Sequence, residues 1–170
     1  GTDQVSTTAV ADDKAVVATP GAALATGTAR NLHATQELKV RQYFEPGGFD
    51  PANLFRIETE NIAFNLYSGL TTFDPDTGKP VPDLAESWTI SPDGTVYTFK
   101  LVKNAEWHKG YGKVTATDVK YSYERVLDTK TGSPYRAELG DIVKIEAPDD
   151  YTVVITLKAP NLNFLYQVGN

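Results

Sequence analysis

The stretch "ESWTISPDGTVYTFKL", residues 86–101, decides the fold class because it contains two strand patterns around a turn. Apolar residues alternate with polar ones along both arms, at Trp88 and Ile90 and then at Tyr97, Phe99 and Leu101. Ser91, Pro92 and Gly94 stand at the positions that a type I turn favours. The stretch therefore predicts an antiparallel hairpin with one buried face.

A second hairpin is expected in "DIVKIEAPDDYTVVITLKAP", residues 141–160. Its alternating apolar residues are Val143, Ile145 and Ala147, then Tyr151, Val153, Ile155 and Leu157. A Pro-Asp-Asp turn separates the two arms. Two hairpins and a few helices predict an α+β fold built mostly from antiparallel sheet.

The sequence predicts a helix that starts at Thr115. This residue is a favoured N-cap, and Asp118 stands three positions later, like the acid of a capping box. Apolar residues at helical spacing, Val119, Tyr123 and Val126, mark the face that packs on the sheet. Lys120, Glu124 and Arg125 are expected on a solvated face.

A second helix is expected over residues 58–67, with acidic residues in its first turn and Gly69 as its C-terminal cap. Before it, "ELKVRQYF", residues 37–44, alternates as a strand does. Residues 1–36 hold few large apolar side chains, so they are expected to form a flexible tether, with a short helix over 12–18 as the alternative.

The composition excludes some classes of function. Net charge is -6 and no run of Lys and Arg interleaves with aromatic residues, so the footprint of a nucleic-acid-binding surface is missing. The chain has no cysteine, and His33 and His108 stand far apart, which argues against a zinc site. "DPDTGK", residues 74–79, imitates a calcium loop, but Lys79 and Ala85 stand where that loop needs Gly and Glu. We expect no metal and no cofactor.

Trp107 and His108 lie in the turn that leads into the helix at Thr115. A tryptophan in such a place usually anchors a loop to the core, so Trp88 and Trp107 are both expected to be core anchors. Contact with a ligand is the alternative for Trp107 and His108. The sequence shows no phosphate loop and no nucleophile elbow, so the residues alone indicate a domain without visible catalytic apparatus.

A resemblance extends these expectations. The chain shows, in order, Asp50-Pro51, Tyr67-Ser68-Gly69-Leu70, Leu84-Ala85-Glu86-Ser87-Trp88, Ser91-Pro92-Asp93-Gly94 with Tyr97-Thr98-Phe99, Trp107, Val114-Thr115-Ala116-Thr117-Asp118-Val119 and Ser133-Pro134-Tyr135. This set resembles the N-terminal part of the family 5 extracellular solute-binding proteins, the peptide and nickel class that serves ABC importers. The stretch "HKGYGKVT", residues 108–115, departs from the family's shorter turn, which leaves its local conformation open.

The resemblance implies the N-terminal part of a two-lobed periplasmic-binding-protein fold of class II, the peptide-binding type, which closes on its ligand. Residues 37–62 would be the first strand and beginning of lobe I, and 63–163 an inserted β-rich subdomain. Residues 164–170 would return toward lobe I, with lobe II absent from the chain. The first 36 residues would be the flexible tether.

The resemblance also implies a function. The protein would be the extracytoplasmic substrate-binding component of an ABC transporter, periplasmic or at the cell surface, and no enzyme. It would capture dipeptides or oligopeptides, or a related solute such as a nickel chelate, an opine or a sugar, and deliver them to the permease subunits. Contact with the membrane is expected only through a lipid anchor, for which the chain shows no cysteine.

Carried over by position, the residues that would contact ligand are Leu54, Phe55, Arg56, Ile57, Glu58, Thr59 and Tyr135. Packing in the core is the alternative for Phe55 and Ile57, and anchoring of a loop for Tyr135. Two other classes stay open. An adhesion or interaction module would use an exposed edge strand, and a hydrolase would need a buried His108 beside a serine.

Overall fold

The computed structural model describes residues 48–54 and 57–169, with the side chains of Ile57 and Glu58 left aside. The tether expected over 1–36 and the strand expected over 37–44 lie outside the described residues. The same holds for Phe55 and Arg56, two of the residues expected to contact ligand.

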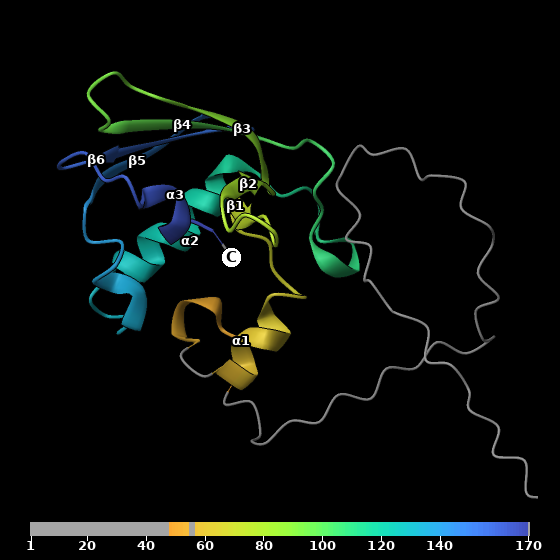
Figure 1. Ribbon diagram of the computed structural model, residues 1–170. Coiled ribbons are helices and arrows are strands. Elements are labelled where there is room, and N and C mark those ends of the chain that lie inside the picture. The colour runs from red at the N-terminus through yellow and green to blue at the C-terminus, as the bar shows by residue number, and fades with distance from the viewer. Residues whose placement is uncertain (1–47, 55–56, 170) are drawn as a thin grey trace, which may run out of the picture. The chain divides into compact units, whose positions relative to one another are not determined.

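A four-stranded antiparallel sheet forms one side of the described region, with the helices on its other side (Figure 1). Its strands are β3 (Ala85–Ile90), β4 (Val96–Leu101), β5 (Ile142–Asp149) and β6 (Thr152–Leu157), in the order β3-β4-β6-β5. Both expected hairpins are confirmed as strand pairs, but Ile90, expected on the buried face with Trp88, is 46% exposed. In the first, the Gly94 N–H donates to the Ser91 carbonyl at 2.8 Å, and Gly94 has φ +71°, a conformation that glycine adopts without strain.

One face of the sheet carries the core. The buried residues of the strands are Ala85, Tyr97, Phe99, Leu101, Ile145, Val153, Ile155 and Leu157. Phe99 is completely buried. The Tyr97 ring stacks beside it with centroids 6.3 Å apart, and the Phe164 ring meets Tyr97 at 4.7 Å. The alternation predicted for β4 and β6 is therefore the alternation of the core.

The prediction for Val143 is wrong, because this side chain is 61% exposed. The register shifts between Ile142 and Lys144, which is a bulge in β5. A bulge adds one residue to a strand and reverses the faces of the side chains before it. As a result Ile142, and not Val143, packs against the core together with Ile145.

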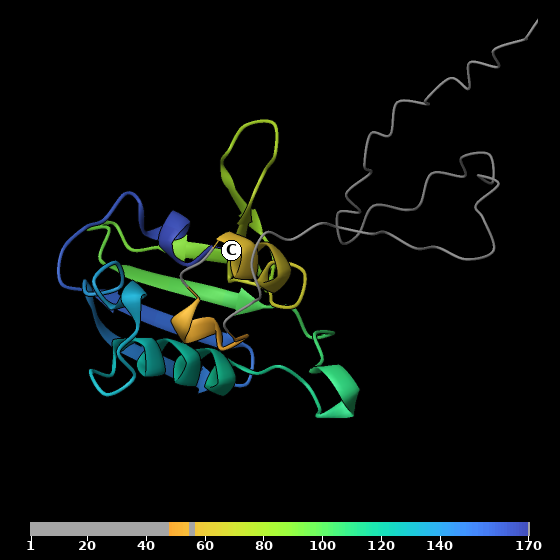
Figure 2. The same cartoon turned by 90° about the horizontal axis from the view of Figure 1, so that it is seen from below.

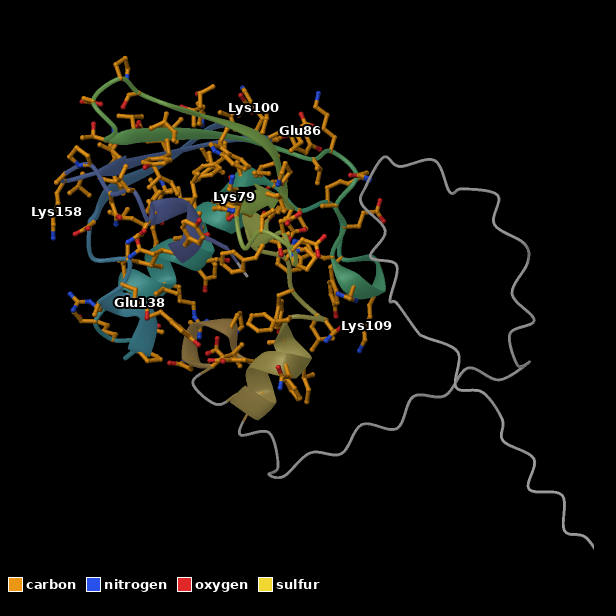
Figure 3. All side chains as sticks on the ribbon, in the orientation of Figure 1. Lys79, Glu86, Lys100, Lys109, Glu138 and Lys158 are labelled. Atoms are coloured by element: carbon orange, nitrogen blue, oxygen red, sulfur yellow. The ribbon has the colours of Figure 1, made fainter. Side chains whose placement is uncertain are left out.

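The opposite face of the sheet is polar. Residues on this side include Thr89, Thr98, Lys100, Lys144, Glu146, Val154 and Thr156. Lys100 donates to the Thr152 hydroxyl at 2.8 Å, and Lys144 pairs with Glu146 at 2.8 Å. Figure 3 shows Lys100 on the side of the sheet away from the helices. Such a face is compatible with solvent, as antiparallel sheets commonly allow.

The helix α2 (Ala116–Leu127) lies along the inner face of the sheet, with α3 (Phe164–Gln167) on the same side (Figures 1 and 2). Its predicted start is confirmed, because the Asp118 carboxylate accepts hydrogen bonds from the N–H and the hydroxyl of Thr115, both at 2.8 Å. Val119 is buried against the sheet, as the helical spacing predicts.

A small two-stranded sheet, β1 (Thr71–Phe73) with β2 (Pro80–Pro82), was not expected from the sequence. Thr71 also forms a parallel bridge with Gly169, and its hydroxyl donates to the Leu165 carbonyl at 2.8 Å. A side chain at Gly169 would meet the Phe73 ring and the Thr71 hydroxyl at 3.2 Å. Glycine therefore permits the close approach of the segment after α3 to β1.

The helix α1 (Ile57–Ala63) is shorter than predicted and does not reach the expected cap at Gly69. The Asn65 side chain donates to the Asn61 carbonyl at 2.8 Å, and the Asn65 N–H donates to Ile62 instead. A side chain that takes a helical carbonyl competes with the backbone ladder, which ends the α-helix in tighter turns.

The prediction of two tryptophan anchors is corrected. Trp88 is partly buried and packs on Phe99 with ring centroids 6.5 Å apart. Trp107 is 38% exposed, in the loop that carries the 3₁₀ helix η2 (His108–Gly110). The backbone holds this loop, since the Trp107 N–H donates to the Gly112 carbonyl at 2.8 Å. Trp107 is therefore no anchor of the main core.

Candidate functional site

Asp50 joins the segment before the candidate ligand residues to α2. Its carboxylate accepts two hydrogen bonds from the Arg125 guanidinium, each 2.5 Å long. The same carboxylate accepts hydrogen bonds from the backbone N–H of Ala52 at 3.1 Å and from the side-chain amide of Asn53 at 3.0 Å. Asp50 thereby caps the 3₁₀ helix η1 (Pro51–Asn53). A forked guanidinium fixes a carboxylate in both position and direction. Arg125 is thus an ion-pair partner, and its assignment to a freely solvated face is corrected.

Hydrogen bonds from Arg125, and then from Asn53 and Ala52, hold the pKa of Asp50 far below its usual range. A carboxyl group with a lowered pKa in the folded state stabilises the fold above its unfolded pKa of about 3.9. This contribution is lost as the pH falls through the folded-state pKa.

We therefore expect Asp50→Asn to be less stable than the wild type at pH 7, and the difference to shrink below about pH 4. Unfolding midpoints measured at pH 7 and pH 3 check this. Asp76→Asn, on an exposed loop, is the control for loss of one negative charge. An equal difference between Asp50→Asn and the wild type at both pH values would contradict the role given to Arg125.

Tyr135 meets α1 from a distant part of the chain. It lies in the 3₁₀ helix η3 (Pro134–Arg136), whose N-cap Ser133 accepts from the Tyr135 N–H at 3.3 Å. Its hydroxyl donates to Glu60 Oε1 at 3.1 Å. Burial and the nearby carboxylates of Glu60 and Glu138 raise the pKa of Tyr135 to about 12. The hydroxyl therefore stays protonated and remains a donor at neutral pH.

These elements surround a cleft of about 390 Å³. Its wall includes Leu54, Glu60, Ala63, Phe64, Tyr67, Phe73, Val126, Tyr135, Glu138, Leu139 and Tyr166. Figure 3 labels Glu138, which follows η3 near the end of α2. Mostly apolar walls with a few convergent polar groups are typical of small-molecule sites. The size and chemistry suit a short peptide segment or a solute of similar size.

Leu54 and Tyr135, two of the residues carried over from the resemblance, share this cleft. Thr59 is buried and does not contribute to the wall. The side chains of Ile57 and Glu58 are not described, and Phe55 and Arg56 lie outside the described residues. Sequence reasoning missed Glu60 and Glu138, because carboxylates are too frequent in this chain to mark a site.

A second cleft, of about 650 Å³, lies beside the Trp107 loop. Its wall includes Leu66, Leu70, Trp107, His108, Val119 and Tyr123. The His108 ring is exposed, and its Nε2 lies 3.3 Å from the Leu66 carbonyl oxygen. The hydrolase alternative required a buried His108, so this observation argues against it.

Two further observations bear on chemistry. Asp74 Oδ1 accepts hydrogen bonds from the N–H groups of Asp76 and Thr77 and from the Thr77 hydroxyl, which makes its loop a self-contained turn. Within the described ranges, His, Asp and Glu side chains form no group of three that could hold a metal ion.

None of the helices that the structure describes is long and apolar enough to cross a membrane.

The family model "Bacterial extracellular solute-binding proteins, family 5 Middle" matches residues 79–170, more than half of the chain. The chain belongs to this family. The family 5 match covers the four-stranded sheet from β3 onward, α2 and α3. It supports the α+β fragment of a periplasmic-binding-protein fold that the sequence predicts.

Individual relatives are similar to this chain in sequence and in structure. Dipeptide-binding protein DppE from Bacillus subtilis is 36% identical over 78% of this chain and 27% of its own length. The structure of AgaA from A. tumefaciens R10 with agropinic acid has a TM-score of 0.68 and 38% identity, over 73% of this chain and 25% of that one.

The structure of Haemophilus influenzae OppA with the peptide RPPGFSPFR has a TM-score of 0.68 and 33% identity, over 74% and 27% of the two chains. The chain therefore spans about a quarter of the length of these relatives. By their names these relatives bind solutes, and none of the three is named as an enzyme.

Proposed function

We propose that the protein is the extracytoplasmic substrate-binding component of an ABC importer, and that it captures dipeptides or oligopeptides. The observation that carries this proposal is the shared cleft of Leu54 and Tyr135, which lie far apart in the sequence. A catalytic role is not part of the proposal.

Peptide comes first among the ligand classes because of the chemistry of this cleft. Apolar and aromatic side chains form most of the wall, and Glu60, Glu138 and the Tyr135 hydroxyl supply polar contacts. A peptide offers apolar side chains together with amide and ammonium groups, which match both kinds of surface. DppE and OppA are named for peptides, whereas AgaA holds agropinic acid, so an opine is the principal competitor.

Location and partners follow from the same proposal. The named relative OppA from Haemophilus influenzae is a periplasmic protein, and we propose a periplasmic or cell-surface location for this one. Its partners would be the permease subunits of the transporter, which receive the ligand when the binding protein opens. A lipid anchor, as proposed from the resemblance, would be its only link to the membrane.

The test identifies the ligand directly. The protein at its full natural length is mixed with a pool of random tri- to pentapeptides, a nickel–histidine chelate and agropinic acid, and retained molecules are identified by native mass spectrometry. We expect peptides to be retained. Retention of the chelate or of agropinic acid, without peptide, would overturn the substrate class.

A matched pair of variants ties the result to the cleft. Phe64 and Ile90 are both large, apolar and about half exposed, but only Phe64 lines the cleft. Phe64→Ala is expected to weaken peptide binding about threefold to tenfold, whereas Ile90→Ala leaves it unchanged. Equal effects of the two substitutions would place the binding site elsewhere.

A further inference from the structure

Two side-chain contacts flank the part of the cleft wall that begins with η1. On one side Asp50 accepts two hydrogen bonds from Arg125, and on the other side Glu60 accepts one from Tyr135. Each contact joins residues 75 positions apart in the sequence. Leu54 lies between the two contacts along the chain. The same region of the fold, from the last turn of α2 to η3, therefore holds this wall at both ends.

A third contact supports the same wall. The Tyr67 hydroxyl donates to the carbonyl oxygen of Phe49, the residue before Asp50, at 2.8 Å. This hydrogen bond joins Tyr67, which follows α1 in the sequence, to Phe49, which precedes it. The neighbouring Asp50 is in turn fastened to α2 by Arg125.

The ion pair is suited to fixing geometry rather than to holding the whole fold together. Both side chains are about one-third exposed, and exposed ion pairs contribute little to global stability. The guanidinium fork nevertheless sets the direction of the Asp50 carboxylate, which caps η1 through Ala52 and Asn53. Loss of the fork would therefore act first on η1 and on Leu54, which follows it.

We propose that Arg125 is a positioning residue for ligand binding, which acts through Asp50 to hold η1 and Leu54 in the cleft wall. The proposal rests on the proposed function for its binding role. Arg125 is absent from the wall of the 390 Å³ cleft, so its effect on a ligand there would be indirect. Preorganised walls bind more tightly because less ordering is needed when the ligand arrives.

The first measurement needs no ligand. In the protein at its full natural length, Arg125→Gln is expected to speed hydrogen exchange at the Ala52 and Asn53 amides about fivefold to tenfold. Exchange at Phe99, in the core, should stay the same. Arg125→Lys keeps the charge without the fork and is expected to fall between Gln and the wild type. Unchanged exchange at Ala52 and Asn53 in Arg125→Gln would overturn the proposal.

The second measurement is the affinity for the tri- to pentapeptide pool. We expect Arg125→Gln to weaken binding about fivefold, with a thermal midpoint lowered no further than that of Asp50→Asn at pH 7, since the contact is local. The matched control is Lys120→Gln, which removes a positive charge from the same helix at an exposed pair with Glu124. Its exchange and affinity should equal those of the wild type.

The outcomes are distinct. Faster exchange at η1 with unchanged peptide affinity would overturn the binding role of Arg125. A global loss of protection that includes Phe99, with a thermal midpoint well below that of Asp50→Asn at pH 7, would show a general structural role and would also overturn it. A wild type that retains no peptide would contradict the proposed function, whereas the exchange measurement would still decide whether Arg125 holds η1. Non-additive effects of Asp50→Asn and Arg125→Gln on exchange would support the path through Asp50.

Discussion

Replacement of Phe99 by Ala is expected to lower the free energy of unfolding by about 3–5 kcal/mol. Phe99 is completely buried in the middle of β4, between the Tyr97 ring and the Trp88 ring. Removal of the ring gives up its burial and leaves a cavity that rigid neighbouring strands cannot fill. Since small domains have about 5–15 kcal/mol in total, the substitution should bring this one close to unfolding.

Chemical denaturation followed by circular dichroism measures this effect. Trp107→Ala is the informative comparison, because Trp107 is the larger residue but is 38% exposed on its loop. It is expected to cost less than about 1.5 kcal/mol. If Trp107→Ala proves as damaging as Phe99→Ala, the loop at η2 belongs to the core and its description as peripheral is wrong.

The second large effect is expected on binding. Tyr135→Ala should weaken the affinity for peptide about 10- to 100-fold, because it removes an aromatic ring from the cleft wall together with the bond to Glu60. Aromatic residues in the middle of a binding surface commonly carry much of the binding energy. Isothermal titration calorimetry on the protein at its full natural length measures the change.

Two further variants separate the causes. Tyr135→Phe keeps the ring and loses the hydroxyl, so it should recover most of the affinity if ring contact dominates. Tyr111→Ala removes a highly exposed tyrosine that lies outside the 390 Å³ cleft and should leave the affinity unchanged. Wild-type affinity in Tyr135→Ala would remove Tyr135 from the candidate site.

The hairpins could be predicted from the sequence because two local signals agreed. The alternation of Tyr97, Phe99 and Leu101 has the period of a strand, and the turn at Ser91 to Gly94 fixes its register. The capping box of Thr115 and Asp118 is equally local, since both residues lie within one turn. Such local sequence patterns depend on residues that are close together in the sequence, so the folded structure keeps the elements that they predict.

Other features depended on contacts that the sequence does not display. The bulge that turns Val143 outward follows from the pairing of β5 with β6. The early end of α1 follows from one hydrogen bond, in which the Asn65 side chain donates to the Asn61 carbonyl and not to solvent. The short strands β1 and β2 pair with each other across residues 74–79, and they were missed because the prolines at 80 and 82 are unfavourable in a strand. Trp107 was misjudged because an aromatic residue in a turn does not show how much of its ring is covered.

The candidate site divides in the same way. Leu54 and Tyr135 could be named only because the motifs around them resemble a family, and their common cleft then follows from the fold. The partners that fix them could not be named. Glu60 and Arg125 read as ordinary charged residues on helix surfaces until Tyr135 and Asp50 are brought to them from 75 positions away.

The contact of β1 with the segment after α3 has a consequence for the order in which the protein is made. A ribosome releases Thr71 almost one hundred residues before Gly169, with which it pairs. The β3–β4 hairpin has its partners close in sequence, and β1 also has β2 nearby, whereas the bridge from Thr71 to Gly169 must wait for the segment after α3. During synthesis the edge of β1 at Thr71 therefore stays open until the segment after α3 is made, and an open strand edge is able to pair wrongly.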